Sequence, residues 1–390
     1  MVSPFAFHTV KTIRFEPGIA SQIADPLGGL LGERVLVVTD PGLIEIGLPG
    51  PALKSLQDAG AELSVFYEVE SDPSLGTLMK AVDLAKEDRV TGVLGFGGGS
   101  SMDVAKLTAL LAGSGEDIDG AWGVGNAKGP RLPLALVPTT AGTGSEVTPV
   151  SIITLPGDEK RGVSSPLLIP DAAILDPDLT LGLPPHTTAA TGIDAMVHAI
   201  EAYASASPNN NPMSKSMAIE ALKLLGPNIE RAVRSPKNRE ARGAMLLGAM
   251  MAGQAFANAP VAAVHALAYP IGGRFHVSHG LSNAIVLPHV LRFNAAGSEE
   301  AMRMYAELSR YAFPDLPATD GAQAQCAAFI ERLAHLAEDL GLETKLRDVG
   351  IGKGDLPKLA SDAMLQTRLL VNNPRNVSEA DALRIYEQAF

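Results

Sequence analysis

Cysteine is almost absent from this chain, with Cys326 the single example among 390 residues. One thiol cannot form an intrachain disulfide, a cysteine-rich zinc site or an iron–sulfur cluster. The N-terminal residues also lack the basic flank and the apolar core of a secretory signal. Both absences fit a reducing compartment, so we expect a cytoplasmic protein.

Positive charge is scarce too, because 31 lysines and arginines face 43 aspartates and glutamates and leave a net charge of −12. Such a chain repels phosphate backbones, and we expect no nucleic-acid partner. Residues 243–271 contain no Lys, Arg, Asp or Glu, as in a membrane span. However, Gln254, Asn258 and His265 interrupt this stretch, and its alanines and glycines suit close helix packing. We interpret it as a buried core helix and expect no membrane partner.

The chain is longer than the roughly 250–300 residues at which a single hydrophobic core stops growing, so we expect two domains. Its first half alternates short β-branched runs with helical stretches and glycine turns, which indicates a parallel sheet covered by helices. In the second half, helix formers continue almost to the end. The pattern predicts an α/β domain over residues 1–185 and an all-α domain over residues 186–390. After the two prolines at this junction, Thr187 or Thr188 would cap the first helix.

A candidate phosphate-binding turn lies in the first half. Buried strands are expected at residues 35–39, 93–96 and 134–137. The turn after the second strand consists of Gly97, Gly98, Gly99 and Ser100. A helix is expected soon afterwards, over residues 102–112. Glycine lets a backbone approach a pyrophosphate closely, and the N-terminus of a helix offers free N–H groups.

A second glycine-containing turn opens with Thr139 and Thr140, directly after the third strand. Two such turns at the carboxyl ends of strands form the crevice in which open α/β sheets bind ligands. The dinucleotide fingerprint G-x-G-x-x-G is incomplete, because Ser100 stands in its sixth place. Asp40, which follows the first strand, could accept hydrogen bonds from an adenosine ribose and would disfavour a 2′-phosphate. The pattern indicates a nucleotide, and neither turn has the G-x-S-x-G spacing of a serine hydrolase.

The second half carries a candidate metal centre. Asp194 and His198 lie four residues apart among helix formers, so both side chains project from one helical face. His265 and His279 lie in two further helical segments, with a proline and two glycines expected to break the chain between them. Three imidazoles and one carboxylate suit Fe(II), Zn(II) or a similar cation and leave a coordination position open for a substrate. A buried Asp194 needs a partner, and an arginine such as Arg274 is the alternative to a metal.

With these motifs the chain resembles the iron-containing, or group III, alcohol dehydrogenase family over essentially its whole length. The matching segments are residues 97–106 (GGGSSMDVAK), 138–146 (PTTAGTGSE) and 191–201 (TGIDAMVHAIE), with the two later histidines and the glycine pair between them. The resemblance implies an N-terminal dinucleotide-binding domain, a helical C-terminal domain and an active site in the cleft between them. It also implies a homodimer or a higher homo-oligomer.

The resemblance further implies a role for each candidate residue. Fe(II), or Zn(II) in its place, would be bound by Asp194, His198, His265 and His279, and NAD by Asp40, Gly97, Gly98, Gly99, Ser100, Thr139 and Thr140. Lys160 matches a lysine placed near the nicotinamide and the substrate. Tyr269 stands where many members have a further histidine, and a phenol does not titrate near neutrality as an imidazole does. His276 is the candidate for that proton-transfer or substrate-contact role.

The combination predicts a metal-dependent oxidoreductase that transfers hydride between NAD(H) and a small alcohol, aldehyde or ketone. A lyase or cyclase similar to dehydroquinate synthase is one alternative, but it needs basic residues that the second half offers in few motifs. A metal-free enzyme similar to maleylacetate reductase is another, and the complete set of one aspartate and three histidines argues against it. A non-catalytic nucleotide-binding protein is the remaining alternative.

Overall fold

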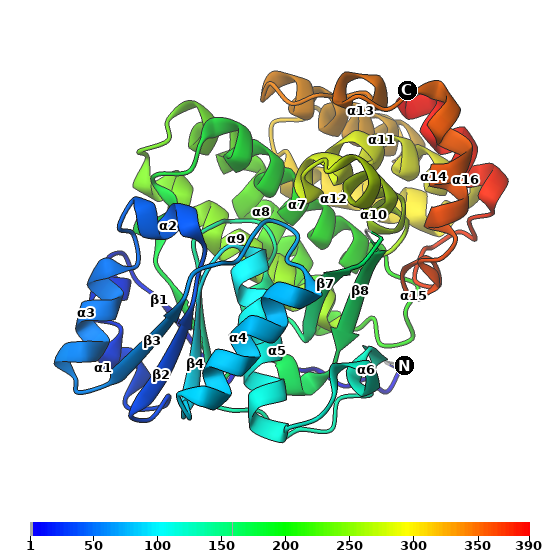
Figure 1. The fold of residues 1–390 in the computed structure, drawn as a ribbon. Helices are drawn as coiled ribbons and strands as arrows, with labels where there is room; N and C mark the ends of the chain where they lie inside the picture. Colours follow the sequence, from blue (N-terminus) through cyan, green and yellow to red (C-terminus); the bar gives the residue numbers. More distant parts are fainter. Residues whose placement is uncertain (1–2, 158) are drawn as a thin grey trace. The chain divides into compact units, whose positions relative to one another are not determined.

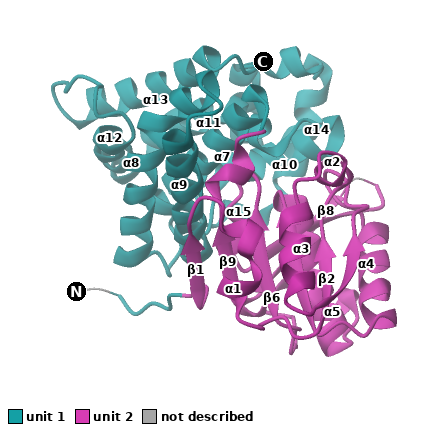
Figure 2. Ribbon diagram, turned by 90° about the vertical axis from the view of Figure 1, so that its left-hand side faces the viewer, with its two compact units in different colours: residues 1–7, 183–390 teal, residues 8–182 magenta. Residues whose placement is uncertain are grey.

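The chain divides into two compact units, which Figure 2 colours separately. The structure is a computed structural model that describes residues 3–157 and 159–390. One unit is His8–Gly182, and the other is Leu183–Phe390 with the N-terminal segment that ends at Phe7. The first unit is an α/β unit and the second is helical (Figure 1). The predicted fold class, a parallel sheet with helices followed by a helical domain, is confirmed.

A six-stranded parallel sheet of order β1-β9-β6-β4-β2-β3 forms the centre of the α/β unit. Its strands are β1 (Thr12–Phe15), β2 (Arg34–Val38), β3 (Glu62–Phe66), β4 (Gly92–Gly97), β6 (Leu134–Pro138) and β9 (Ala172–Leu175). Its helices are α1 (Ala24–Leu27), α2 (Pro41–Glu45), α3 (Gly50–Asp58), α4 (Leu75–Glu87), α5 (Gly99–Ser114) and α6 (Ile118–Ala121). The three predicted strands are therefore β2, β4 and β6, which are neighbours.

A smaller sheet of order β5-β8-β7 was not predicted. Its strands are β5 (Gly123–Val124), β7 (Val150–Leu155) and β8 (Glu159–Ser164). The β8 sequence is mostly polar, so it lacks the apolar pattern from which a strand is inferred. The segment is a strand because it pairs antiparallel with β7, and this pairing cannot be inferred from the polar sequence of β8.

Both faces of the large sheet are buried, which follows from the two-residue period of a strand. In β2, Leu36 and Val38 pack into a core that includes buried residues of α4 and α5. Val35 and Val37 point the other way, into a core that includes residues of α1 and α3. A continuous apolar run is therefore the sequence signature of a strand covered by helices on both sides.

Ten helices are described in the second unit. They are α7 (Pro185–Ala204), α8 (Pro212–Arg234), α9 (Arg239–Asn258), α10 (Ala263–Phe275), α11 (His279–Gly297), α12 (Glu299–Ala312), α13 (Ala322–Asp339), α14 (Leu356–Ala363), α15 (Thr367–Leu370) and α16 (Glu379–Ala389). Buried residues lie all along α7 and α11, so these two helices form the interior of the unit.

Two local predictions in this unit are wrong. The helix α7 begins at Pro185, so neither Thr187 nor Thr188 caps it. Proline suits the first helical position, because its φ is already helical and its missing N–H would have no helical partner there. The chain also does not break at Pro270, since α10 continues through it to Phe275. Burial of α10 in the core outweighs the lost hydrogen bond of that proline.

No single helix among the described residues is long and apolar enough to cross a membrane. The helices α9 and α10 satisfy such a test only together, and they meet at an angle of 107°. The uncharged stretch that was interpreted as one core helix is thus divided between two helices, both largely buried.

Candidate functional site

The two glycine-containing turns lie at the carboxyl ends of the neighbouring strands β4 and β6. The N–H of Thr139 donates to the carbonyl oxygen of Gly97 at 2.9 Å, which extends the strand pairing into the turns. Asp40 follows the adjacent strand β2, and its Oδ1 accepts the N–H of Leu43 at 3.0 Å as the N-cap of α2. All three segments therefore meet at one edge of the sheet.

The glycines of the first turn allow a close approach that a side chain would block. A Cβ added to Gly97 would lie 2.6 Å from the hydroxyl oxygen of Ser101 and 3.5 Å from Oδ2 of Asp40. A Cβ added to Gly99 would lie 2.9 Å from the methyl carbon of Thr143. Gly97 also has a φ of 156°, at the edge of the region that favours glycine.

This turn has the features that a dinucleotide requires. A Cβ on Gly98 would lie 3.7 Å from Thr140, so the two turns are adjacent. Gly98 caps α5 without a side-chain hydrogen bond, and half-buried Ser100 lies in the first turn of that helix. The buried Thr140 hydroxyl has no hydrogen-bond partner within the described residues. Free helix N–H groups, bare backbone and an unpaired hydroxyl fit a pyrophosphate.

A group of polar side chains beside α5 is satisfied by the chain itself. The buried Lys106 ammonium donates to the hydroxyls of Ser145 at 2.8 Å and Thr148 at 3.1 Å, and to the carbonyl oxygen of Val150 at 2.8 Å. The Ser145 hydroxyl donates to Asp103 Oδ1 at 2.8 Å. Burial lowers the pKa of Lys106 to about 8, although neighbouring carboxylates oppose this. We call Asp103, Lys106, Ser145, Glu146 and Thr148 the Lys106 cluster.

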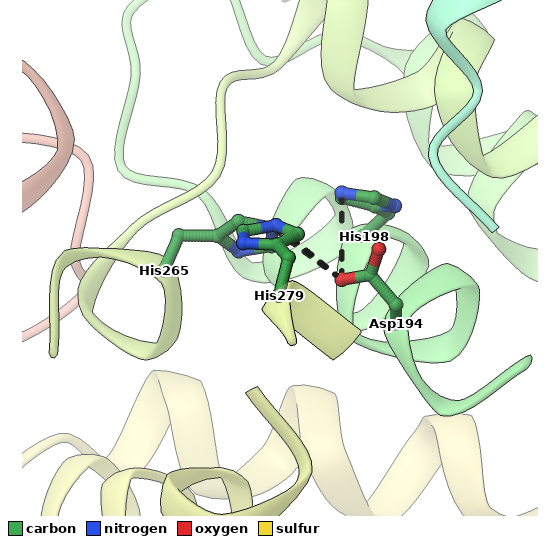
Figure 3. A group of neighbouring side chains, drawn as sticks. All are labelled: Asp194, His198, His265 and His279. Carbon is green, nitrogen blue, oxygen red and sulfur yellow. Dashed lines mark ion pairs between the residues drawn. The ribbon is translucent and has the colours of Figure 1, made fainter. Parts of the chain in front are cut away.

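Four candidate metal ligands converge from three helices of the second unit (Figure 3). Asp194 and His198 lie one turn apart on α7, His265 lies in the first turn of α10, and His279 is the first residue of α11. Asp194 Oδ1 lies 3.9 Å from Nε2 of His198 and of His265, and 3.7 Å from Nε2 of His279. One atom from each residue lies within 4.8 Å of the others. We call these four residues the Asp194 cluster.

The electrostatics of the Asp194 cluster favour a cation. Burial opposes ionisation of Asp194, but the three histidines and a hydrogen bond from Asn283 lower its pKa below the usual value. Asn283 Nδ2 lies 2.6 Å from Asp194 Oδ1, 3.3 Å from His265 Nε2 and 3.2 Å from His279 Nε2. The Asn283 amide thus lies against three of the polar atoms that face one another in the cluster. Three imidazole nitrogens and one carboxylate fit a divalent metal.

Glu201, one turn after His198 on α7, orients His265. Its Oε2 accepts the N–H of Ala262 at 3.0 Å and faces His265 Nδ1 at 2.7 Å, while Oε1 accepts the N–H of Val264 at 2.7 Å. Because the carboxylate accepts, Nδ1 carries the ring proton and Nε2 presents its lone pair to the cluster. Burial raises the pKa of Glu201 to about 7 and lowers that of His265 far below its usual value, so the ring stays neutral.

The surroundings of the cluster differ from one side to the other. Phe256 stacks on His198 with the ring centroids 4.5 Å apart. The Tyr269 ring lies 5.8 Å from that of His279, and Arg368 Nη2 donates to the Tyr269 hydroxyl at 3.3 Å. Phe256 therefore covers one face of the His198 ring, whereas Tyr269 and Arg368 give the His279 side polar and positively charged neighbours.

The remaining predicted residues have other immediate neighbours. Lys160 lies on β8 of the α/β unit, where its ammonium pairs with Asp72 at 2.5 Å. His276 follows the last residue of α10, exposed and with a left-handed φ of 54°. Arg274 pairs with Asp362, so the alternative of an arginine partner for Asp194 is not realised by this residue.

Sequence reasoning missed Glu201, Asn283 and Arg368. Glu201 is a carboxylate in an apolar helix, which is the signal that identified Asp194. Asn283 lies four residues after His279, on the same helical face. Both could have been found from spacing, whereas Arg368 lies far along the chain from every ligand and gives no local signal.

Comparison with known proteins gives the same answer for both units. The model for "Iron-containing alcohol dehydrogenase" matches residues 11–177, and that for "Fe-containing alcohol dehydrogenase family, C-terminal" matches residues 188–390. The chain is 39% identical over 389 residues to long-chain-alcohol dehydrogenase 1 of Geobacillus thermodenitrificans, covering 96% of this chain and 93% of the relative.

Solved structures agree. A crystal structure of 1,3-propanediol oxidoreductase has a TM-score of 0.93 at 31% identity and covers 99% of this chain and 100% of its own. A sulfoacetaldehyde reductase from Bifidobacterium kashiwanohense in complex with NAD+ has a TM-score of 0.85 at 28% identity, with 99% and 98% covered.

Proposed function

This chain belongs to the family of iron-containing alcohol dehydrogenases, and we propose from this premise that the Asp194 cluster holds its catalytic metal. Membership makes the protein an NAD-dependent oxidoreductase that interconverts an alcohol and its aldehyde or ketone. The observation that carries the proposal is the convergence of one carboxylate and three imidazoles within 4.8 Å.

The metal that we propose is Fe(II), and Zn(II) suits the same donors. A divalent cation bound there supplies Lewis-acid polarisation of the substrate oxygen. Asp194 contributes the negative charge that balances the cation, and Glu201 keeps the His265 lone pair available. Phe256 would shield one face of His198 from water, since it stacks on this ring.

We further propose that residues 1–185 form the NAD-binding domain and residues 186–390 the metal-binding domain. The pyrophosphate would bind the residues of the two turns, Gly97, Gly98, Gly99, Ser100, Thr139 and Thr140. Asp40 would accept the hydroxyls of the adenosine ribose and select NAD over NADP. Its proximity to Gly97 supports this role.

Two residues are proposed for the steps around hydride transfer. Lys160 would contact the nicotinamide or the substrate, for which it must leave Asp72. His276 would exchange the alcohol proton with solvent, and its exposure and its position three residues before His279 support this. General acid–base catalysis contributes about 10²–10⁴-fold, so a His276→Gln change is expected to lower kcat within that range.

We also propose a homodimer or higher homo-oligomer in the cytoplasm. The edge strand β1 is largely exposed and carries Phe15 with 40% of its surface accessible, which suits pairing with a second copy. Cys326 is the single cysteine of the chain and is buried, which suits a reducing compartment. Light scattering of the purified protein and cell fractionation test the two statements.

The central test is NADH oxidation by anaerobically purified protein with a panel of short-chain aldehydes. Chelator-stripped protein is compared with samples reloaded with Fe(II) or with Zn(II). Restoration of turnover by a metal is the expected result and identifies that metal. Turnover that survives complete metal removal would contradict the proposal and favour a metal-free reductase.

A further inference from the structure

Arg368 is a cation near the Asp194 cluster that the proposed function leaves without a role. It lies on α15, is half-buried, and donates through Nη2 to the Tyr269 hydroxyl at 3.3 Å. Its Cζ is 5.7 Å from the centroid of the Tyr269 ring. Among the residues that the structure describes, no carboxylate pairs with it. The nearby Arg274, by contrast, is paired with Asp362.

The position of this guanidinium relates it to the metal ligands. Tyr269 stands between Arg368 and His279, with its ring 5.8 Å from that of His279 and tilted by 57°. The Arg368 side chain touches no ligand directly, so Tyr269, which contacts both Arg368 and His279, is the residue that relates it to the cluster.

A half-buried guanidinium without a carboxylate has unused binding capacity. The group has five N–H donors in a planar fork and carries a positive charge. The Tyr269 hydroxyl accepts from one nitrogen only. The planar fork matches the paired oxygens of a carboxylate or a sulfonate, and such charge-assisted pairs are strong.

We propose that Arg368 binds an anionic group at the far end of the substrate, so that the enzyme acts on short alcohols and aldehydes that carry a carboxylate or a sulfonate. The proposal rests on the proposed function, because the reacting oxygen of the same molecule must lie at the Asp194 cluster. Tyr269 presents the guanidinium on the His279 side, while Phe256 stacks on His198 on the other side. The anion is thereby directed to one side of the cluster.

The reaction itself is unchanged by this assignment. In the reducing direction a hydride passes from NADH to the carbonyl carbon, one proton reaches the carbonyl oxygen, and NAD+ and the alcohol are formed. Arg368 forms and breaks no covalent bond, so it determines specificity. Its loss is expected to raise KM for anionic substrates far more than it lowers kcat.

The experiment compares substrates that differ in charge, using metal-loaded enzyme. Succinic semialdehyde is measured against its methyl ester and against butanal, and sulfoacetaldehyde against propanal separates sulfonate from carboxylate recognition. We expect kcat/KM for at least one anion to exceed that of its neutral counterparts by about 10–100-fold. Arg368→Gln should abolish this preference by lowering kcat/KM for the anions far more than for butanal, and Arg368→Lys should retain part of it.

Arg303→Gln is the matched control, because Arg303 lies on α12 and is paired at the surface with Glu299. It should keep the preference, and metal content verifies that each variant is folded. Equal kcat/KM for charged and neutral aldehydes, or an Arg368→Gln enzyme with the wild-type preference, would overturn the proposal while the dehydrogenase assignment stands.

A binding measurement keeps the test independent of turnover. If the metal-loaded protein reduces no aldehyde, the proposed function fails, and calorimetric titration with γ-hydroxybutyrate then tests Arg368 alone. Binding by the wild type that Arg368→Gln loses supports the anion site. Absence of binding by the wild type excludes it.

Discussion

The Lys106 cluster and the Asp194 cluster are both buried groups of polar side chains, but only the first contains its own cation. The Lys106 ammonium donates to three oxygen atoms, one of which is the hydroxyl of Ser145. That hydroxyl in turn donates to the carboxylate of Asp103. In the Asp194 cluster, one carboxylate oxygen and imidazole nitrogens face one another at 3.7–3.9 Å. The donor between them is the amide of Asn283.

The difference separates a structural network from a functional one. Buried polar groups are normally satisfied by the chain, because an unpaired group costs about 1–3 kcal/mol. In the Lys106 cluster, Lys106, Ser145, Thr148 and Asp103 have partners within the chain, and these bonds tie α5 to β7 and to the segment before it. The Asp194 cluster brings one carboxylate oxygen and three imidazole nitrogens within 4.8 Å of one another and includes no lysine or arginine, so its residues suit a ligand that brings positive charge. Burial alone would not have distinguished the two.

The largest difference between the two clusters is expected when one carboxylate is removed from each, because only the Asp194 cluster is proposed to bind a metal. Asp194→Ala should abolish metal binding and lower kcat/KM by about a thousandfold or more, since Lewis-acid stabilisation supplies several kcal/mol. Metal content by elemental analysis and NADH oxidation should fall together.

Asp103→Asn is the control for that change, because Asp103 accepts hydrogen bonds from Ser145 and from the N–H of Ile152 without facing a histidine. It should lower stability and leave metal content at the wild-type level. Equal metal loss in both variants would show that general unfolding, not ligand loss, explains the Asp194 result.

The next largest effect is a loss of stability on substitution of Lys106, the cation of the Lys106 cluster. Lys106→Met removes the positive charge that acts on Asp103 and Glu146 and leaves three buried oxygens without this donor, and a buried polar group left unpaired costs about 1–3 kcal/mol. Urea unfolding followed by circular dichroism should show a loss in this range, with metal bound per folded chain unchanged. A loss below about 1 kcal/mol would mean that the carboxyls are satisfied without Lys106.

The sequence indicates parts of this comparison well and other parts poorly. Asp194 and His198 could be paired from their four-residue spacing, because a helix fixes which side chains share a face. The glycine turns indicated which edge of the sheet binds a ligand, but not the order of its strands. The burial of Lys106 could not be predicted, since it depends on contacts with β7, whose partner β8 has no apolar pattern. Arg368 likewise reaches Tyr269 only through tertiary packing.

Glu201 and Glu146 allow the same substitution, glutamate to glutamine, to be compared for its effect on metal affinity beside each cluster. Burial raises the pKa of both carboxyls to about 7, but only Glu201 contacts a histidine. Glu201→Gln places an amide donor against N–H groups and disturbs His265, so metal affinity should fall about 10–100-fold, as for other residues behind metal ligands. Glu146→Gln should leave it unchanged. Competition with a chromogenic chelator measures both, and equal affinity in the two variants would remove Glu201 from the site.

The smallest expected effect concerns His289, a largely buried histidine that does not belong to the Asp194 cluster, and it is a change in how stability depends on pH. His289 lies on α11 with His279, and burial, assisted by Arg292, lowers its pKa to about 4. The folded chain keeps it neutral, whereas the unfolded chain protonates it near pH 6.5, so stability falls as the pH drops from about 6.5 to 4. His289→Gln should reduce the stability lost between pH 7 and pH 4.5 by about 1–2 kcal/mol in urea unfolding. His335→Gln, at an exposed histidine, should match the wild type. An identical loss in the wild type and the His289 variant would show that burial of this ring does not control its protonation.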